Sequence, residues 1–117
     1  MSNLPKGFRG AAIAAGLKSS GALDLTLIVN DGPRFDAAAV YTTNKVVAAP
    51  GIWSSEVTKG KLVRAAVLNS GGANACTGPQ GFADTHQTAE KVGELLNISS
   101  GEVVVCSTGL IGELLPM

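Results

Sequence analysis

A Thr-Gly step close to the last residue is the strongest candidate for chemistry in this sequence. Thr108 and Gly109 follow a run of β-branched residues, so a strand is expected to deliver a hydroxyl and a sterically open backbone amide to one place. If a helix begins here, its first N–H groups lack intrahelical partners and can bind an anion or a developing oxyanion. Such donors contribute roughly 2.7–4 kcal/mol each to acyl-transfer transition states. An ordinary strand-to-helix turn with Thr108 as N-cap explains the same spacing.

A glycine-rich stretch at residues 69–74 (NSGGAN) is a second candidate. Successive glycines permit a nest of N–H groups that binds phosphate or carboxylate. The stretch lacks the Lys-Ser/Thr ending of a P-loop and the spacing of a dinucleotide fingerprint. A tightly packed structural loop is therefore the alternative.

Two cysteines and one histidine are possible catalytic groups, with Cys76 or Cys106 as nucleophile and His86 as base. Against this, His86 falls on the apolar face of a predicted helix, and Cys106 ends a valine run as a small core residue does. No cluster of His, Asp, Glu or Cys has the spacing of metal ligands. We therefore expect neither a metal site nor a bound cofactor.

Short segments separated by turn residues are expected to position the N-terminal half of the chain. Residues 22–29 and 37–42 are predicted as strands joined through the Asn-Asp-Gly-Pro turn at 30–33, as in a hairpin with a long loop. Residues 45–52 are a further candidate strand, in which Pro50 indicates an edge or an end. Residues 53–60 predict one or two helical turns that Gly60 closes.

The C-terminal half has a clearer pattern, with predicted buried strands at residues 62–68 and 102–106 on either side of a helix. This helix is expected to begin near Pro79, because proline suits the first helical position. Its apolar face has helical spacing and comprises Phe82, His86, Ala89, Val92 and Leu96. The order strand, helix, strand fits a parallel crossover or an α+β sheet layer equally well.

Length and composition describe one domain with few bulky side chains. The 117 residues suit a single domain, and apolar residues make up 45% of them while aromatic residues make up only 4%. Nine basic and nine acidic residues cancel, which argues against nucleic acid or an anionic membrane as partner. A charged fraction of 15% is low for a stable soluble monomer, so either another chain covers much of the surface or the domain is small and well packed.

The compartment follows from the absence of targeting signals. Residues 1–7 lack the apolar core of a signal peptide, and no apolar run reaches the roughly 18 residues of a membrane helix. Cys76 and Cys106 stand 30 residues apart without a CxxC motif. We expect a cytoplasmic protein with two reduced, buried thiols.

Four blocks of sequence carry a family resemblance that covers the chain from Gly7 onward. They are GFRGAAIAAGLKSSGALDLTLIVNDGP at 7–33, AAVYTTNKVVAAP at 38–50, LNSGGANACTGPQGFADT at 68–85 and CSTGLIGELLPM at 106–117. Together they resemble the N-terminal portion of the ornithine acetyltransferases, the glutamate N-acetyltransferases of arginine biosynthesis. The resemblance implies an α+β layered fold, similar in outline to N-terminal-nucleophile hydrolases with αββα layering.

The resemblance also implies an activity. Family members cleave themselves before a threonine into an α and a β chain, and the new N-terminal Thr of the β chain is the nucleophile, with its own amino group as base. Acetyl passes from N2-acetylornithine to this Thr and then to glutamate, and some members also accept acetyl-CoA. The family's oxyanion Thr-Gly pair falls on Thr108 and Gly109. An α2β2 heterotetramer is the implied assembly.

The resemblance further implies that the family's α chain continues past the Leu-Pro-Met motif and that the nucleophilic Thr follows on the β chain. We therefore expect residues 1–117 to be one domain, a truncated α-chain portion that is inactive alone. Two other readings remain open, a non-catalytic domain whose glycine-rich loops bind a carboxylate or phosphate, and a scaffold that pairs with a partner chain.

Overall fold

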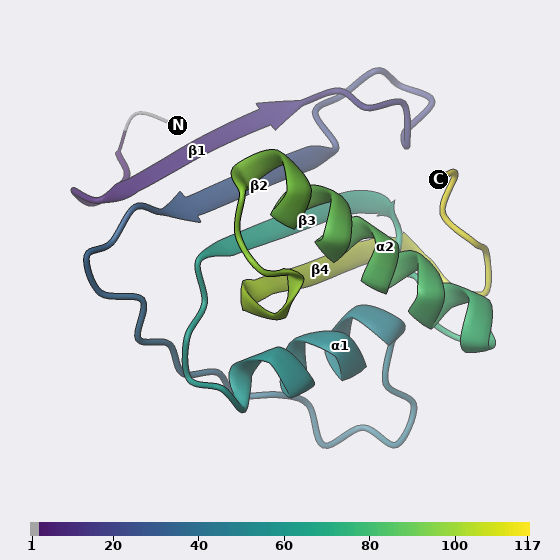
Figure 1. Ribbon diagram of the computed structural model, residues 1–117. Helices are drawn as coiled ribbons and strands as arrows, with labels where there is room; N and C mark the ends of the chain where they lie inside the picture. The colour runs from purple at the N-terminus through teal and green to yellow at the C-terminus, as the bar shows by residue number, and fades with distance from the viewer. Residues whose placement is uncertain (1–2) are drawn as a thin grey trace.

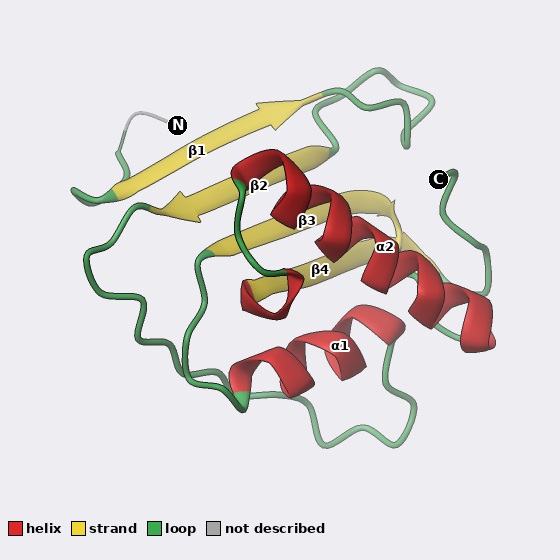
Figure 2. Cartoon of the chain, viewed as in Figure 1, coloured by secondary structure: helices red, strands yellow, loops and turns green. Residues whose placement is uncertain are grey.

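A four-stranded mixed sheet packs against two helices. The computed structural model describes residues 3–117, so the first two residues of the segment 1–7 lie outside the described part. The elements in chain order are β1 (Phe8–Ile13), β2 (Leu25–Asn30), α1 (Ala49–Thr58), β3 (Ala65–Gly72), α2 (Gly78–Leu96), a short 3-10 helix (Ser100–Glu102) and β4 (Val103–Leu110). Helix α2 crosses in front of the sheet and α1 lies along its β4 edge (Figures 1 and 2).

The strand order β1-β2-β3-β4 joins two antiparallel pairs to one parallel pair, β3 with β4. Helix α2 is the crossover between the parallel strands, which need a long connection to run in the same direction. The parallel crossover and the α+β sheet layer, which the sequence left as alternatives, are therefore both present, because the crossover is part of an α+β sheet. The carboxyl ends of β3 and β4 meet at one edge, where Ser70 pairs with Thr108 and Gly71 with Gly109.

The core lies between α2 and the front of the sheet. Ala89, at the middle of α2, is 0% exposed and packs on valines of β3 and β4 such as Val67 and Val103. The predicted helix is confirmed, with proline in its first turn. Its buried stripe differs in the first half, where Gly81 and Thr85 are buried while Phe82 and His86 lie further out.

Helix α1 covers the free edge of β4 through side-chain hydrogen bonds to the strand's backbone. Ser54 Oγ donates to the carbonyl oxygen of Val105 at 2.8 Å and accepts from its N–H at 2.9 Å. The indole N–H of Trp53 donates to the carbonyl oxygen of Val103 at 2.9 Å. An uncovered edge strand is a template for unwanted pairing, so these contacts both stabilise β4 and protect it.

Two predicted strands in the first half are wrong. Residues 37–42 form no strand, and β2 pairs with β1 and β3 instead. Val40 in this segment is 98% exposed, so its side chain is not packed against an apolar surface. Residues 45–52 run into α1, because Pro50 occupies the first helical turn rather than a strand end. The helix expected at 53–60 exists but begins at Ala49, and β1 was not predicted at all.

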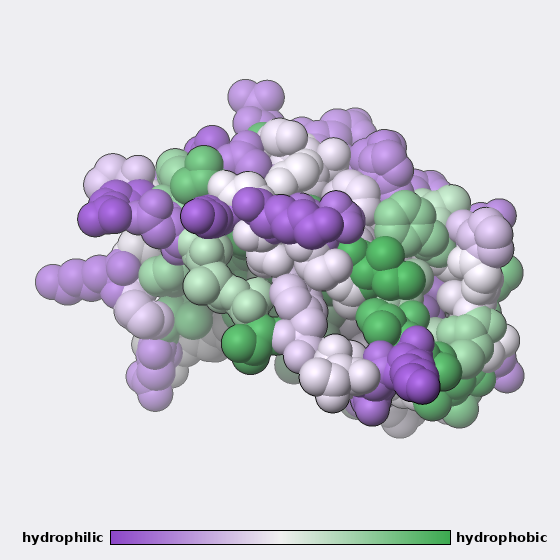
Figure 3. Space-filling model, turned by 90° about the horizontal axis from the view of Figure 1, so that it is seen from below, coloured by the Kyte–Doolittle hydropathy of each residue, from purple (hydrophilic) through white to green (hydrophobic). Residues whose placement is uncertain are grey.

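The sheet leaves a second surface open, here called the open face, which comprises the side chains that alternate with the core residues: Ile28, Ala66, Leu68, Val104 and Cys106. These residues are half-buried, or exposed in the case of Cys106, while the neighbours on β3 and β4 that face α2 are buried. A groove of ≈ 570 Å³ also lies beside β1 and the end of α2, lined by residues that include Phe8, Arg9 and Leu96. Hydrophobic side chains also gather on the surface seen from below (Figure 3).

Large apolar side chains are exposed in several places along the chain. They include Val40 and Val46 in the loop before α1, and Leu110 and Ile111 after β4. Apolar residues that form a contiguous exposed patch mark an interaction surface, whereas single exposed ones are normal. Within residues 3–117, the helices are too short or too polar to cross a membrane.

Candidate functional site

The Thr-Gly step lies near the C-terminal end of strand β4 and not at the start of a helix. Strand β4 continues to Leu110, and residues 111–117 contain no helix. Both helix-based interpretations of this step, the anion-binding helix N-terminus and the N-cap of a strand-to-helix turn, are therefore wrong. The donors available here are the hydroxyl of Thr108 and the backbone amide of a strand end.

Gly109 is in close backbone contact with β3. Its φ angle is +132°, and a Cβ at this position would lie 2.5 Å from the carbonyl carbon of Gly71 and 2.6 Å from the nitrogen of Gly72. No side chain can be accommodated between the two strand ends. The pairing is irregular here, because Gly72 pairs with both Thr108 and Leu110. Glycines on both strands thus allow the ends of β3 and β4 to approach closely.

Thr108 is exposed, and its side chain belongs to the open face. Successive side chains of a strand point to opposite sides, so Thr108 shares a side with Cys106, while Ser107 faces α2 with Val105. Both Thr108 and Gly109 are exposed. The predicted donors therefore belong to residues that lie at the surface.

A pair of polar side chains ties the two strand ends together behind Thr108. The hydroxyl of Ser107 donates to Asn69 Oδ1 in a short hydrogen bond, and Asn69 Nδ2 donates to the carbonyl oxygen of Gly72 at 3.0 Å. The first bond links β4 to β3, and the second fixes the irregular backbone of Gly72. Sequence reasoning missed this pair, because it appears only when the register of the parallel strands is known.

A small cavity adjoins the same strand ends. It measures ≈ 110 Å³, and its lining includes Leu17, Gly71, Leu110 and Leu115. The C-terminal segment forms one wall: the N–H of Gly112 donates to the carbonyl oxygen of Ala75 at 2.8 Å, and a Cβ on Gly72 would lie 2.6 Å from Leu115. This cavity is large enough for a few atoms only.

The glycine-rich stretch serves as packed structure. Residues 69–72 belong to β3, and Asn74 is 0% exposed with a left-handed backbone (φ 50°). Asn74 Nδ2 donates to the carbonyl oxygen of Gly81 and to Thr85 Oγ1, both at 2.9 Å, while Asn74 Oδ1 accepts from Thr77 at 2.6 Å. This network holds the loop before α2 to the helix's first turn. Of the two alternatives, the structural loop accounts for these contacts.

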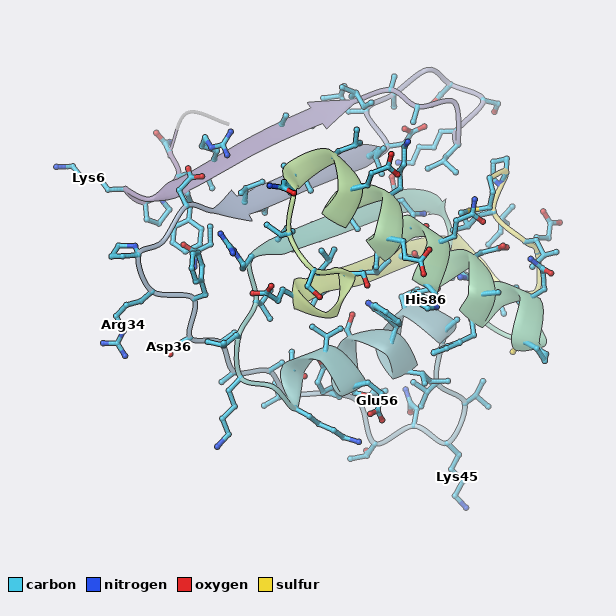
Figure 4. The ribbon with its side chains drawn as sticks, viewed as in Figure 1. Lys6, Arg34, Asp36, Lys45, Glu56 and His86 are labelled. Carbon is cyan, nitrogen blue, oxygen red and sulfur yellow. The ribbon has the colours of Figure 1, made fainter. Side chains whose placement is uncertain are left out.

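The expectation of two buried thiols is wrong, because Cys76 and Cys106 are both exposed. Cys106 ends a valine run, but its side chain alternates onto the open face. His86 stacks on Trp53 with ring centroids 4.8 Å apart and lies 2.8 Å from a carboxylate oxygen of Glu90. Figure 4 shows His86 between α2 and α1. These contacts engage the imidazole with α1 and its own helix.

Charged groups lie mainly at the periphery, as the labelled side chains of Lys6, Arg34 and Lys45 show (Figure 4). Among residues 3–117, no three His, Cys, Asp or Glu side chains come together as a metal site would require. The carboxylate with the most hydrogen bonds is Asp24, which accepts from the N–H groups of Ala15 and its neighbours. These backbone hydrogen bonds, that from Ala15 foremost, hold the pKa of Asp24 below its usual range.

The α+β sheet places this chain in the structural class of the ornithine acetyltransferases, as two solved structures show. An ornithine acetyltransferase from Mycobacterium tuberculosis, described as complexed with ornithine, superposes with a TM-score of 0.96 at 58% identity, over 97% of this chain and 61% of that one. The arginine biosynthesis bifunctional protein from Bacillus halodurans superposes with a TM-score of 0.90 at 42% identity, over 96% and 58%. The predicted fold class is thus confirmed.

The chain belongs to the ArgJ family, whose sequence model matches residues 9–117. The arginine biosynthesis bifunctional protein ArgJ of Streptomyces avermitilis is 63% identical over 112 residues, and that of Mycobacterium bovis is 58% identical over 118. The family resemblance drawn from the four sequence blocks is therefore confirmed. The chain spans 29% of the length of these two relatives, while they cover 96% and 97% of this chain.

Proposed function

We propose that the full-length protein containing this segment transfers acetyl from N2-acetyl-L-ornithine to L-glutamate. The observation that carries this proposal is the match, at 58% identity and a TM-score of 0.96, to an ornithine acetyltransferase described as complexed with ornithine. The names of the relatives assign them to arginine biosynthesis, and acetyl transfer of this kind is a reaction of that pathway.

The role proposed for this segment is to stabilise the oxyanion. The amino group of an N-terminal Thr on a separate β chain takes the proton of that residue's own hydroxyl. The hydroxyl oxygen attacks the acetyl carbon of acetylornithine, and the carbonyl oxygen becomes negative. Thr108 Oγ–H and the N–H of Gly109 are the donors to that oxygen. When the carbonyl reforms, ornithine leaves with a proton on its α-amine and the Thr carries an acetyl ester. The amine of glutamate then attacks this ester, which yields N-acetylglutamate and restores the Thr hydroxyl.

The exposed position of Thr108 and Gly109 supports a nucleophile that arrives from another chain. Both residues lie at the surface, and Thr108 is on the same side of the sheet as the apolar residues of the open face, such as Leu68 and Val104. A layer that covers this face would both bury apolar surface and bring its own groups to the strand end. We assign this layer to the rest of an α2β2 heterotetramer, in which autocatalytic cleavage exposes the Thr of the β chain.

Single substitutions in the full-length protein test the assigned role. Thr108→Ala removes one oxyanion donor and is expected to lower kcat for acetyl transfer by roughly 10–1000-fold. Thr108→Ser keeps a hydroxyl and should restore much of the rate. Thr43→Ala makes the same change in the exposed loop before α1 and should leave kcat unchanged. The assay measures ornithine and N-acetylglutamate together, and an unchanged kcat in Thr108→Ala would refute the assignment.

Two further measurements bound the proposal. Purified residues 1–117 alone, mixed with acetylornithine and glutamate, should show no turnover, because the nucleophile lies on a different chain. Replacing acetylornithine with acetyl-CoA in the full-length assay determines whether the protein is bifunctional. Product formation from acetyl-CoA and glutamate would add amino-acid acetyltransferase activity, and its absence would restrict the donor to acetylornithine.

A further inference from the structure

A buried carboxylate at the start of β2 organises the loop that follows β1. Asp24 is 3% exposed. Its Oδ1 accepts from the N–H of Ala15 at 2.6 Å, and its Oδ2 accepts from the N–H groups of Leu17 and Lys18 at 2.8 and 3.0 Å. Three donors on two oxygens require a carboxylate, since an asparagine amide has one acceptor oxygen and would direct its own N–H₂ group at the remaining N–H groups.

The backbone of Asp24 joins the same loop to the sheet. Its N–H donates to the carbonyl oxygen of Ile13, the last residue of β1, at 3.0 Å. Its carbonyl oxygen accepts from the N–H of Ser70 at 2.9 Å, and Ser70 is paired with Thr108 across the parallel strands. Asp24 therefore lies one strand, β3, away from Thr108, the proposed oxyanion donor. It fixes the loop at the end that follows β1 and at the end that leads into β2.

The loop that Asp24 holds lies directly against the glycine contact at the strand ends. A Cβ on Gly71 would lie 3.1 Å from the carbonyl oxygen of Leu17 and 3.2 Å from its Cβ, so Leu17 covers Gly71 from one side. The backbone of Gly71 in turn touches Gly109. Leu17 also lines the cavity of ≈ 110 Å³ beside these glycines. The contacts run without a break from Asp24 through Leu17 and Gly71 to Gly109.

We propose that Asp24 is a positioning residue for acetyl transfer, because its carboxylate fixes the loop that supports the Thr108–Gly109 step through Leu17 and Gly71. This inference rests on the proposed function of that step. Gly71 has a positive φ of 105° and no side chain, so its position depends on what packs against it. A misplacement of about 1 Å in a catalytic group can reduce the rate about 10²-fold. Holding the loop therefore contributes to the rate without any contact between Asp24 and substrate.

The test is Asp24→Asn in the full-length protein. We expect kcat for acetyl transfer to fall about 10–100-fold while KM for acetylornithine changes less than about twofold, because the donors move but the rest of the substrate's contacts remain. Asp31→Asn is the matched control: it is the same change at the opposite end of β2, in an exposed carboxylate that accepts from Arg9 at 2.7 and 2.9 Å, and should leave kcat unchanged.

A second control separates positioning from stability. Val57→Ala opens space in the buried face of α1, away from the strand ends, and lowers Tm without moving the donors. If Val57→Ala loses as much kcat as Asp24→Asn at equal loss of Tm, or if Asp24→Asn retains the wild-type kcat, the proposal is overturned. Leu17→Gly keeps the Asp24 carboxylate and removes the Leu17 Cβ that lies against Gly71. It serves if Asp24→Asn does not fold, and an unchanged kcat there also overturns the proposal.

The same experiment distinguishes failure of this inference from failure of the proposed function. An inactive wild-type protein, or a Thr108→Ala variant with unchanged kcat, contradicts the function assigned to the strand end. An active wild type whose rate depends on Thr108 but not on Asp24 or Leu17 contradicts only the positioning role.

Discussion

Replacing Gly109 with alanine tests the backbone contact on which the candidate site depends. A Cβ at Gly109 would lie 2.5 Å from the carbonyl carbon of Gly71, which is 0.9 Å short of the 3.4 Å at which ordinary contact begins. Backbone atoms cannot rotate away as a side chain does, so the strand ends must separate. Overpacking of this kind costs about 1–3 kcal/mol. The φ of +132° adds a conformational cost of about 1–3 kcal/mol for a residue with a side chain.

The expected loss of unfolding free energy for Gly109→Ala is therefore about 2–6 kcal/mol, measured by urea denaturation of the full-length protein. Two alanine substitutions at other glycines separate the contributions. Gly112 has a φ of +88° but no atom within 4 Å of its Cβ position, so only the conformational cost applies. Gly101 has neither a positive φ nor a contact nearer than 3.5 Å, and its substitution should be close to neutral.

Activity gives an independent readout of the same substitution. A separation of the strands by about 1 Å displaces the N–H of Gly109 and should lower kcat about 100-fold in the fraction that folds. The reasoning is refuted if Gly109→Ala is no less stable than Gly112→Ala, since the contact with Gly71 would then have no cost. A folded Gly109→Ala variant with the wild-type kcat would remove this residue from the oxyanion site.

Two other predictions concern stability. Ser54→Ala leaves the N–H and carbonyl groups of Val105 unpaired at the edge of β4, and should lower the unfolding free energy by about 1–3 kcal/mol in urea titrations. Ser55→Ala is the control: it removes a hydroxyl that is hydrogen-bonded only within α1, and should change the unfolding free energy by less than about 0.5 kcal/mol. Because backbone hydrogen bonds lower the pKa of Asp24, its stabilisation is complete above the unfolded value of about 3.9 and is lost as pH falls through the lower folded pKa. The Tm difference between wild type and Asp24→Asn should narrow below about pH 4, and a constant difference from pH 7 to pH 3 would contradict this assignment.

The second half of the fold could be predicted from local pattern because each element there has a strong signal. Pro79 suits the first turn of α2, and the apolar spacing from Ala89 onward matches the side of the second half of the helix that packs on the core. The apolar runs at residues 65–68 and 103–105 form the first halves of β3 and β4. Propensity, periodicity and turn residues agree in this region, which is the condition under which sequence reasoning works.

The first half could not be predicted in the same way, because small and β-branched residues give ambiguous signals. Strand β1 has the sequence FRGAAI, in which glycine and alanine have low strand propensity, and its existence depends on pairing with β2. Proline is found both at strand ends and in the first turns of helices, and only the hydrogen bonds of α1 show that Pro50 belongs to a helix. Residues 37–42 have strand composition but no neighbouring strand to pair with.

Within the candidate site, residue types could be identified but their supports could not. Thr108 and Gly109 stood out because a hydroxyl and an open amide adjoin at a strand end. The bond between Ser107 and Asn69 spans 38 residues and depends on the β3–β4 register, which local pattern does not contain. Asp24 likewise has no sequence signal, since its loop donors become neighbours only when β1 and β2 form a hairpin.

The way the strand end is built indicates what each chain contributes. The step at Thr108 is positioned by backbone packed on backbone, through Gly71, Gly72 and Gly109, within this one segment. A helix N-terminus would have supplied several amides and a dipole, whereas a strand end supplies few donors and must hold them rigidly to be effective. Its shape therefore depends on contacts within this sheet. On the proposed mechanism the partner then supplies the nucleophile to a site whose donors are already in place, and the energy of reorganising them does not add to the barrier.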